Sequence, residues 1–171
     1  DAGVSRIEAV IYTHAHADHT HGIDDLRMIV INMRQRLPVW ADTGTAKALT
    51  ARFGYVFKTP EGSAYPPILD LNTFARGCTI EGPGGPIPFE AIPVEHSGIP
   101  CCGFRIGGLC YMPDVIDMPQ TSWNRIQNLD IWILDALKRT PHPSHLSFDQ
   151  ALSWIAKATP KRGILTNMHI D

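Results

Sequence analysis

The stretch that decides the fold is His14-Ala15-His16-Ala17-Asp18-His19, which places four candidate metal ligands within six positions. It follows an apolar run at residues 7–12, so we expect a strand over 6–13 with the ligands at its end, where α/β proteins place binding groups. In extended backbone, residues two apart point to the same side, so His14 and His16 can converge on one ion. Asp18 and His19 lie beyond the bend and turn toward another ion. The spacing therefore predicts two metals.

The alternative interpretation is a polar loop whose histidines bind nothing. The eight histidines of the chain fall at 14–21, at 96 and at 142–169, as expected if they meet in the folded protein. A helical metalloprotease site is excluded because H-E-x-x-H is absent, and Thr13, Thr20 and Gly22 make the stretch a poor helix former. These observations favour metal binding.

This motif resembles the signature of the metallo-β-lactamase superfamily, in which the same hexad follows an apolar strand and precedes a glycine-opened helix, here at 22–26. Later segments resemble the family one at a time. Glu95-His96-Ser97 resembles the segment of the third histidine ligand, and residues 109–114 resemble the strand that delivers a bridging carboxylate, Asp114. Residues 163–169 resemble the final strand and its terminal ligand, His169. The resemblance covers essentially the whole chain.

The resemblance implies a centre with two divalent metal ions. One ion would be held by His14, His16, His96 and Asp114, and the other by Asp18, His19, His169 and Asp114. Two such ions ~3.5 to 4 Å apart can share a water and lower its pKa toward neutrality, which gives a metal-bound hydroxide nucleophile. Imidazole and carboxylate ligands suit zinc or manganese, and iron is possible. Asp114 stands where some true β-lactamases have a cysteine ligand, which disfavours antibiotic hydrolysis.

Other segments resemble the phosphodiesterase branches, above all the phosphoribosyl cyclic phosphate phosphodiesterase branch. A strand expected at 130–134 ends in Asp135, and Pro141-His142-Pro143-Ser144-His145-Leu146-Ser147 precedes the last helix. In those branches an acidic residue and a later His-x-Ser/Thr occupy these places. The resemblance implies that His145 donates a proton or hydrogen bond to a phosphate oxygen, that Asp135 fixes its tautomer, and that Asp18 is also catalytic. For His145 the alternative is a residue at the start of the helix near the surface, and His142 is open between substrate contact and capping of the loop. His21 is expected to support the site or the fold rather than to bind metal.

The predicted function is therefore metal-dependent hydrolysis of a phosphodiester, in a small cyclic phosphate or a nucleotide-like metabolite. The alternatives are a hydrolase of a thioester or lactam, an oxidative relative from quinone cofactor biosynthesis, an endonuclease of the tRNA 3′-processing type, and a non-catalytic metal-binding module. The formal net charge is −2, which disfavours nucleic acid as a partner and favours a small phosphorylated substrate.

Composition predicts one globular domain over 1–171, because the chain is 44% hydrophobic and 19% charged. Four cysteines without C-x-x-C spacing are typical of a reduced, cytoplasmic protein, and no apolar run approaches the ~20 residues of a membrane span. The family places several strands before the hexad, which begins here at position 14. We therefore expect a fragment of the α/β fold of that family, an αβ/βα four-layer sandwich without its N-terminal strands.

Further elements are predicted from hydrophobic periodicity and from the positions of glycine, proline and capping residues. We expect about four strands between 72 and 114, and a capping box of Ser147 and Gln150 at the start of the last helix, with Trp154 in packing. Helices are expected at 22–33, at 43–53 capped by Thr43 and ended by Gly54, and at 119–127. The proline-rich stretch 58–67 is predicted to be a lid or a subunit contact, which would suit a homodimer.

Overall fold

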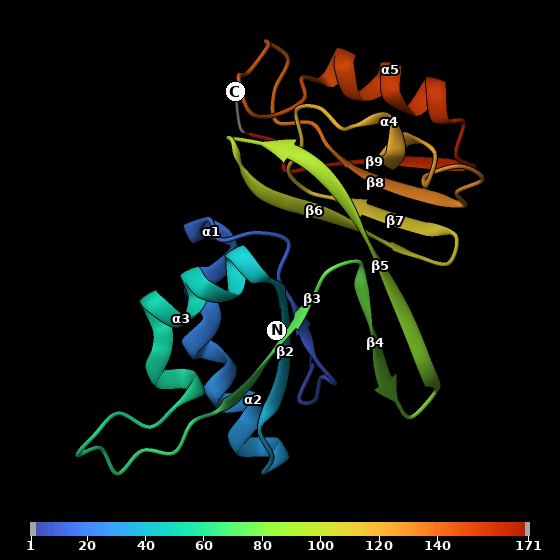
Figure 1. The fold of residues 1–171 in the computed structure, drawn as a ribbon. Helices are drawn as coiled ribbons and strands as arrows, with labels where there is room; N and C mark the ends of the chain where they lie inside the picture. The colour runs from blue at the N-terminus through green and yellow to red at the C-terminus, as the bar shows by residue number, and fades with distance from the viewer. Residues whose placement is uncertain (1–2, 170–171) are drawn as a thin grey trace. The chain divides into compact units, whose positions relative to one another are not determined.

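The computed structural model describes residues 3–169, and these form two compact units (Figure 1). The first unit runs to Ala75 and also includes Ile80–Pro86, and the second contains Arg76–Thr79 and the chain from Ile87 onward. Each unit has a hydrophobic core of its own.

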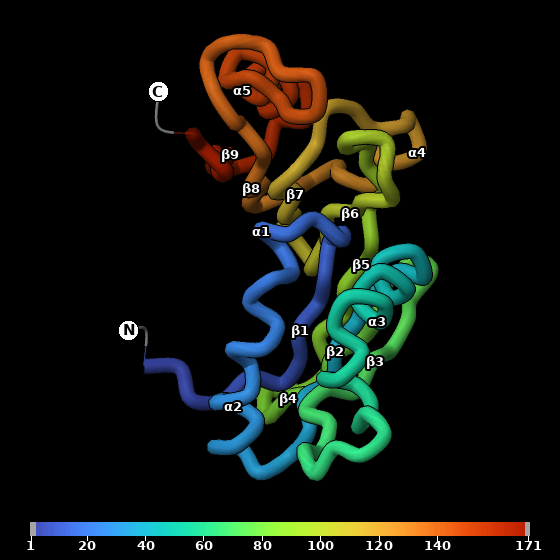
Figure 2. Tube along the Cα trace, turned by 90° about the vertical axis from the view of Figure 1, so that its left-hand side faces the viewer, coloured from blue at the N-terminus to red at the C-terminus, as the bar shows by residue number. Residues whose placement is uncertain are grey.

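The first unit is built on a parallel sheet in the order β1-β2-β3, with β1 at Val10–Ile11, β2 at Leu37–Asp42 and β3 at Leu69–Phe74. Parallel neighbours need crossover connections, and these are the helices α2 (Leu26–Met33) and α3 (Thr43–Phe57). Figure 2 shows the chain passing between strands and helices in this order. Side chains from both helices and from the sheet share one buried core, which includes Val30, Val39, Leu49 and Leu69.

The hexad follows β1 directly, as the sequence predicts, although β1 is shorter than the expected strand at 6–13. Beyond β1, the Tyr12 amide still donates to the Trp40 carbonyl at 2.9 Å. The chain then makes a single helical turn, α1 (Ala17–Thr20), and a 3-10 helix, η1 (His21–Asp25). The predicted helix at 22–33 is thus wrong in its first turn, because regular α-helix begins only at Leu26.

The predictions for both ends of α3 are wrong. Its N-cap is Asp42 rather than Thr43, since Asp42 Oδ1 accepts the amides of Gly44 at 2.7 Å and Thr45 at 3.2 Å. The helix also continues past Gly54 to Phe57, with a kink at Phe53, whose φ is −129°. Glycine ends a helix only where the backbone adopts the left-handed conformation, and Gly54 stays within the helix here.

Most of the second unit is a six-stranded sheet in sequence order, of which residues 80–82 and 85–86 belong to the first unit. Its strands are β4 (Gly77–Gly82), β5 (Gly85–His96), β6 (Ile99–Ile106), β7 (Leu109–Met112), β8 (Ile131–Asp135) and β9 (Arg162–Thr166). Strands β5, β6 and β7 pair antiparallel, whereas β7, β8 and β9 pair parallel. The strands expected between 72 and 114 correspond to β4 through β7.

Two helices belong to this unit, and the sequence predicts one of them well. α5 (Phe148–Ala158) begins at Ser147, and the predicted capping box is confirmed: Ser147 Oγ accepts the Gln150 amide and Gln150 Oε1 accepts the Ser147 amide. α4 (Gln120–Trp123) is shorter than the helix expected at 119–127. Trp154 on α5 stacks at 6.3 Å on Trp132, which is fully buried, so Trp154 packs as predicted.

The register of the parallel strands positions the candidate site. Met112 on β7 pairs with Leu134 on β8, and Leu134 pairs with Leu165 on β9. The residues that follow these three strands therefore emerge side by side at the carboxyl edge of the sheet, where α/β proteins bind ligands. Asp114, Asp135 and Asn167 lie at or just beyond these strand ends.

The proline-rich stretch 58–67 connects α3 to β3 and bonds to itself. The Thr59 hydroxyl donates to the Tyr65 carbonyl at 3.1 Å, and the Tyr65 amide donates to Ser63 Oγ at 3.2 Å. Tyr65 is 77% exposed. The function of this stretch as a lid or subunit contact stays a prediction. Within residues 3–169, the helices are too short or too polar to cross a bilayer.

Candidate metal centre

The hexad gathers three imidazoles within the first unit. The ring of His14 lies 4.6 Å from that of His16 and 4.3 Å from that of His19, measured between centroids. His14 is fully buried, and its Nδ1 lies 3.0 Å from the Thr13 hydroxyl. Asp18 is exposed, with Oδ2 at 3.4 Å from His19 Nε2. The turn from β1 into α1 thus brings together the candidate ligands of this stretch.

Contacts from neighbouring elements hold this turn. The Thr20 hydroxyl donates to the His16 carbonyl at 2.8 Å, and the Arg52 guanidinium of α3 donates to the Ala15 carbonyl. His21 instead packs its ring against Phe53, with centroids 5.7 Å apart. This contact favours the structural alternative for His21.

The second unit gathers a second group, His96, Asp114 and His145. His96 ends β5, Asp114 follows β7, and His145 lies in the loop before α5. One ligand atom from each lies within 4.8 Å of the other two, and His96 and Asp114 are each only 2% exposed. Imidazole nitrogen and carboxylate oxygen are donors that zinc, manganese and ferrous iron accept. This group therefore fits a divalent cation.

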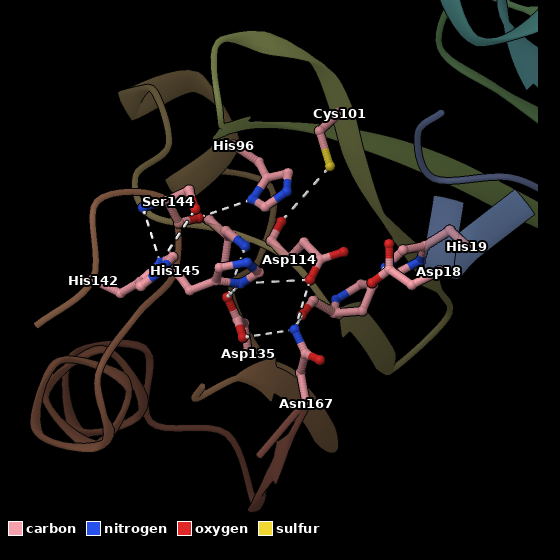
Figure 3. Close-up of polar contacts among 12 residues, drawn as sticks. Asp18, His19, His96, Cys101, Asp114, Asp135, His142, Ser144, His145 and Asn167 are labelled. Atoms are coloured by element: carbon pink, nitrogen blue, oxygen red, sulfur yellow. Dashed lines mark hydrogen bonds and ion pairs between the residues drawn. The ribbon is translucent and has the colours of Figure 1, made fainter. Parts of the chain in front are cut away.

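Hydrogen bonds orient both imidazoles of this group (Figure 3). His96 Nδ1 lies 2.8 Å from the Ser144 carbonyl oxygen, so Nδ1 carries the proton and Nε2 is the nitrogen that can bind a cation. His145 Nδ1 lies 2.8 Å from Asp135 Oδ2 and 3.5 Å from Asp114 Oδ1. The two rings are 4.7 Å apart. Asp135 is thus hydrogen-bonded to His145, whose tautomer the family resemblance implies it would fix.

Burial perturbs Asp135 strongly. Loss of solvent raises the pKa of its carboxyl to about 7, and the nearby charge of Asp114 adds to the rise. Hydrogen bonds from the backbone of Val115, the side chain of Asn167 and the backbone of Leu146 act in the opposite direction. A buried carboxyl with such a pKa, bonded to an imidazole, is typical of sites that move protons.

Sequence reasoning missed Asn167 as a site residue. Its amide nitrogen lies 2.7 Å from Asp114 Oδ1 and 3.4 Å from Asp135 Oδ1, and it also donates to the Pro113 carbonyl at 3.3 Å (Figure 3). The backbone of Asn167 is left-handed, with φ of 60°, which asparagine tolerates better than most residues. One amide therefore bridges two buried carboxylates, and no spacing rule in the sequence marks it.

His169 lies near the end of the described chain and is exposed. Its backbone amide donates to the Leu137 carbonyl at 2.7 Å, which ties this segment to the start of the loop before α5. His169 is not one of the three residues grouped in the second unit, where His145 stands beside His96 and Asp114. The role of His169 as a metal ligand stays a prediction.

Comparison with known proteins agrees with this arrangement. Residues 1–170 match the family described as the Beta-lactamase superfamily domain. The chain belongs to this family. Its two sheets with their helices are the α/β fold expected from the hexad, and solved structures of that fold resemble it over nearly its whole length.

One solved structure similar to this chain is "a New Diphosphatase from the PhnP Family", with 31% identity, a TM-score of 0.83 and coverage of 97% of this chain. Zinc-bound PqqB from Methylobacterium extorquens is 17% identical with a TM-score of 0.68, over 98% of this chain and 65% of that one. An octanoyltransferase of Porphyromonas gingivalis is 28% identical over 98% of this chain. The chain spans 61% of the diphosphatase and 33% of the octanoyltransferase.

Proposed function

We propose that this chain is the catalytic domain of a metal-dependent phosphodiester hydrolase that acts on a small phosphorylated molecule. The observation that carries the proposal is His145, bonded through Nδ1 to buried Asp135 and grouped with His96 and Asp114. The similarity to a diphosphatase at 31% identity supports cleavage at phosphorus. The formal net charge of −2 supports a small substrate over a nucleic acid.

The proposal includes two divalent cations, zinc or manganese. One cation would take His14, His16, His96 and Asp114, and the other Asp18, His19, His169 and Asp114. When bound, such a pair supplies a water of lowered pKa and offsets the negative charge of the phosphoryl group. The imidazole and carboxylate donors gathered in each unit are the chemistry that these ions need.

His145 would handle the proton of the leaving group. Its Nδ1 is engaged by Asp135 at 2.8 Å, so Nε2 is the nitrogen from which a proton passes to the departing oxygen. The carboxylates of Asp135 and Asp114 both lie within 3.5 Å of Nδ1 and stabilise the protonated imidazole before transfer. Asp135 thus holds the ring in one tautomer and orientation, as a buried carboxylate does for a general acid or base.

A direct test uses the full-length protein with bis(p-nitrophenyl) phosphate. Hydrolysis should stop on chelation and return with zinc or manganese. His145→Ala should lower turnover about 10²- to 10⁴-fold, the range for loss of a general acid, with bound metal unchanged. His21→Ala removes an exposed histidine that packs on Phe53 and serves as the matched control. Wild-type turnover in His145→Ala would remove this residue from the mechanism, and loss of metal would make it a ligand instead.

Acyl chemistry is the second candidate, because one relative of this chain is named an octanoyltransferase. The matched region is 33% of that protein, so the activity in its name can belong to the part that this chain does not match. An octanoyl thioester assayed beside the phosphodiester separates the two candidates. Turnover of the thioester without turnover of the phosphodiester would favour acyl transfer or thioester hydrolysis.

A further inference from the structure

The loop between β8 and α5 carries a second imidazole that the proposed chemistry does not use. His142 precedes His145 by three residues, and its ring centroid lies 5.2 Å from that of His145 at an interplanar angle of 48°. Figure 3 shows both rings on this loop, beside the backbone of Ser144. His142 is partly exposed, whereas His145 is largely covered.

Hydrogen bonds determine which nitrogen of His142 carries the proton. The Ser144 backbone amide lies 3.4 Å from His142 Nδ1, and the Ser144 hydroxyl lies 3.2 Å from the same atom. A backbone N–H can only donate, so Nδ1 presents its lone pair and the proton of the neutral ring is on Nε2. His142 therefore offers one N–H donor through Nε2.

The backbone of the loop holds this donor in place. Pro141 and Pro143 flank His142 and restrict the backbone on both sides. At the base of the loop, the Leu137 amide donates to the Leu146 carbonyl at 2.9 Å, and the Phe148 amide donates to the Lys138 carbonyl at 3.0 Å. A donor held in this way loses little conformational entropy when a ligand binds.

The charge of the loop indicates an anionic ligand. Between Asp135 and Asp149 the charged residues of the loop are Lys138 and Arg139, both basic. Because the flanking imidazole of His145 is assigned to a phosphoryl group, the anion at His142 must lie beside that group. In a diphosphate the two phosphoryl groups share one bridging oxygen, so adjacent imidazoles can each contact one of them.

We propose that His142 is a substrate-binding residue that donates Nε2–H to a second phosphoryl group, and that the substrates of this protein are therefore diphosphate diesters. The proposal rests on the function proposed above and narrows its substrate class. In the reaction, a P–O bond forms to the oxygen of water and the P–O bond to the bridging oxygen breaks. The departing phosphate monoester takes up the proton delivered by His145, and the products are two phosphate monoesters.

The test compares two substrates of the full-length metal-loaded protein, diadenosine diphosphate and bis(p-nitrophenyl) phosphate. His142→Ala should raise KM for the diphosphate about tenfold or more, as expected for a lost hydrogen bond to a charged group, with kcat little changed. KM for the single phosphodiester should stay within about twofold, because that substrate lacks the second group. His142→Gln places an amide N–H near the position of Nε2 and should restore most of the lost affinity.

A binding measurement keeps the test independent of turnover. Calorimetry with a methylene-bridged analogue of diadenosine diphosphate should show the same order of affinity, with wild type and His142→Gln above His142→Ala. His21→Ala should bind as wild type does. Equal affinity of wild type and His142→Ala for the analogue would overturn the proposal, whatever the enzyme hydrolyses. Hydrolysis of the phosphodiester with equal KM changes for both substrates would also overturn it and leave the proposed function intact.

Discussion

The two units assemble their candidate ligands in different ways. The first unit takes all of them from the hexad, where one strand end and one helical turn bring His14, His16 and His19 within ring contact. The second unit takes His96 and Asp114 from the ends of β5 and β7, and the loop before α5 places His145 beside them. The first arrangement depends on local backbone geometry, and the second depends on sheet register and on loop closure.

The site in the second unit is therefore sensitive to errors in strand pairing. In the second unit a one-residue slip of β8 against β7 would turn Asp135 to the opposite face of the sheet, away from His145 and Val115. Buried contacts therefore reinforce this edge, including the Asn167 amide between Asp114 and Asp135. The hexad ligands are neighbours in the chain, so their grouping does not depend on strand register.

The largest expected effect follows from removing one ligand in each unit. His14→Ala and Asp114→Ala should each lower turnover of the phosphodiester by at least about a hundredfold. This loss is larger than the one expected for substitution of a residue that only hydrogen-bonds to a metal ligand. Both should also lower the metal content measured by inductively coupled plasma mass spectrometry. Full metal content in either variant would remove that residue from the proposed ligand set.

Core substitutions test whether the units are separate folding units. Leu49→Ala in the first core and Leu134→Ala in the second should each lower the free energy of unfolding of its own unit by about 2–5 kcal/mol. Urea titrations can follow the units separately, because Trp40 belongs to the first while Trp123, Trp132 and Trp154 belong to the second. An equal displacement of one common transition by both variants would show that the units unfold together.

Substitution of Asn167 tests whether the candidate site of the second unit needs the amide between Asp114 and Asp135. Asn167→Gly keeps the left-handed backbone and removes the amide, so turnover should fall about 10- to 100-fold while stability changes little. Asn167→Asp should lower turnover further, because it sets a third carboxylate against Asp114 and Asp135.

Thr159→Gly provides the matched control for this change. Thr159 has a similar left-handed φ of 50° at the end of α5 and no part in the proposed site. Its turnover should equal that of wild type. Wild-type turnover in Asn167→Gly would mean that Asp114 and Asp135 keep their positions without the amide.

The smallest expected effects come from the helix caps. Each unit has a helix with a side-chain N-cap, so the same kind of substitution can be made in both. Asp42→Ala at α3 and Ser147→Ala at α5 each remove a side chain that accepts backbone amides, and each should cost about 1 kcal/mol of stability. Thermal unfolding followed by circular dichroism measures both. A much larger loss for Ser147→Ala would show that this cap also holds the loop of His142 and His145.

The sequence predicts local patterns more reliably than it predicts the ends of helices. The capping box of Ser147 and Gln150 was found because both residues act within one turn of helix. The sequence predicts Thr43 as the cap of α3 and Phe53 as its end, whereas the structure has Asp42 and Phe57. Neighbouring polar residues compete for a cap, and packing of Val56 in the core carries the helix past Gly54. Such choices depend on tertiary contacts that propensity does not include.

The sequence by itself determined the metal-binding chemistry of this protein, because the hexad places its imidazoles and carboxylate within six consecutive residues. It also determined the family and the α/β class, through that hexad and the strand segments around it. Only the tertiary structure decided how the second half is held, with His96 on the Ser144 carbonyl and Asn167 between two carboxylates. Those partners lie far apart in the chain, and they meet because strand pairing and loop closure bring them to one edge of a sheet.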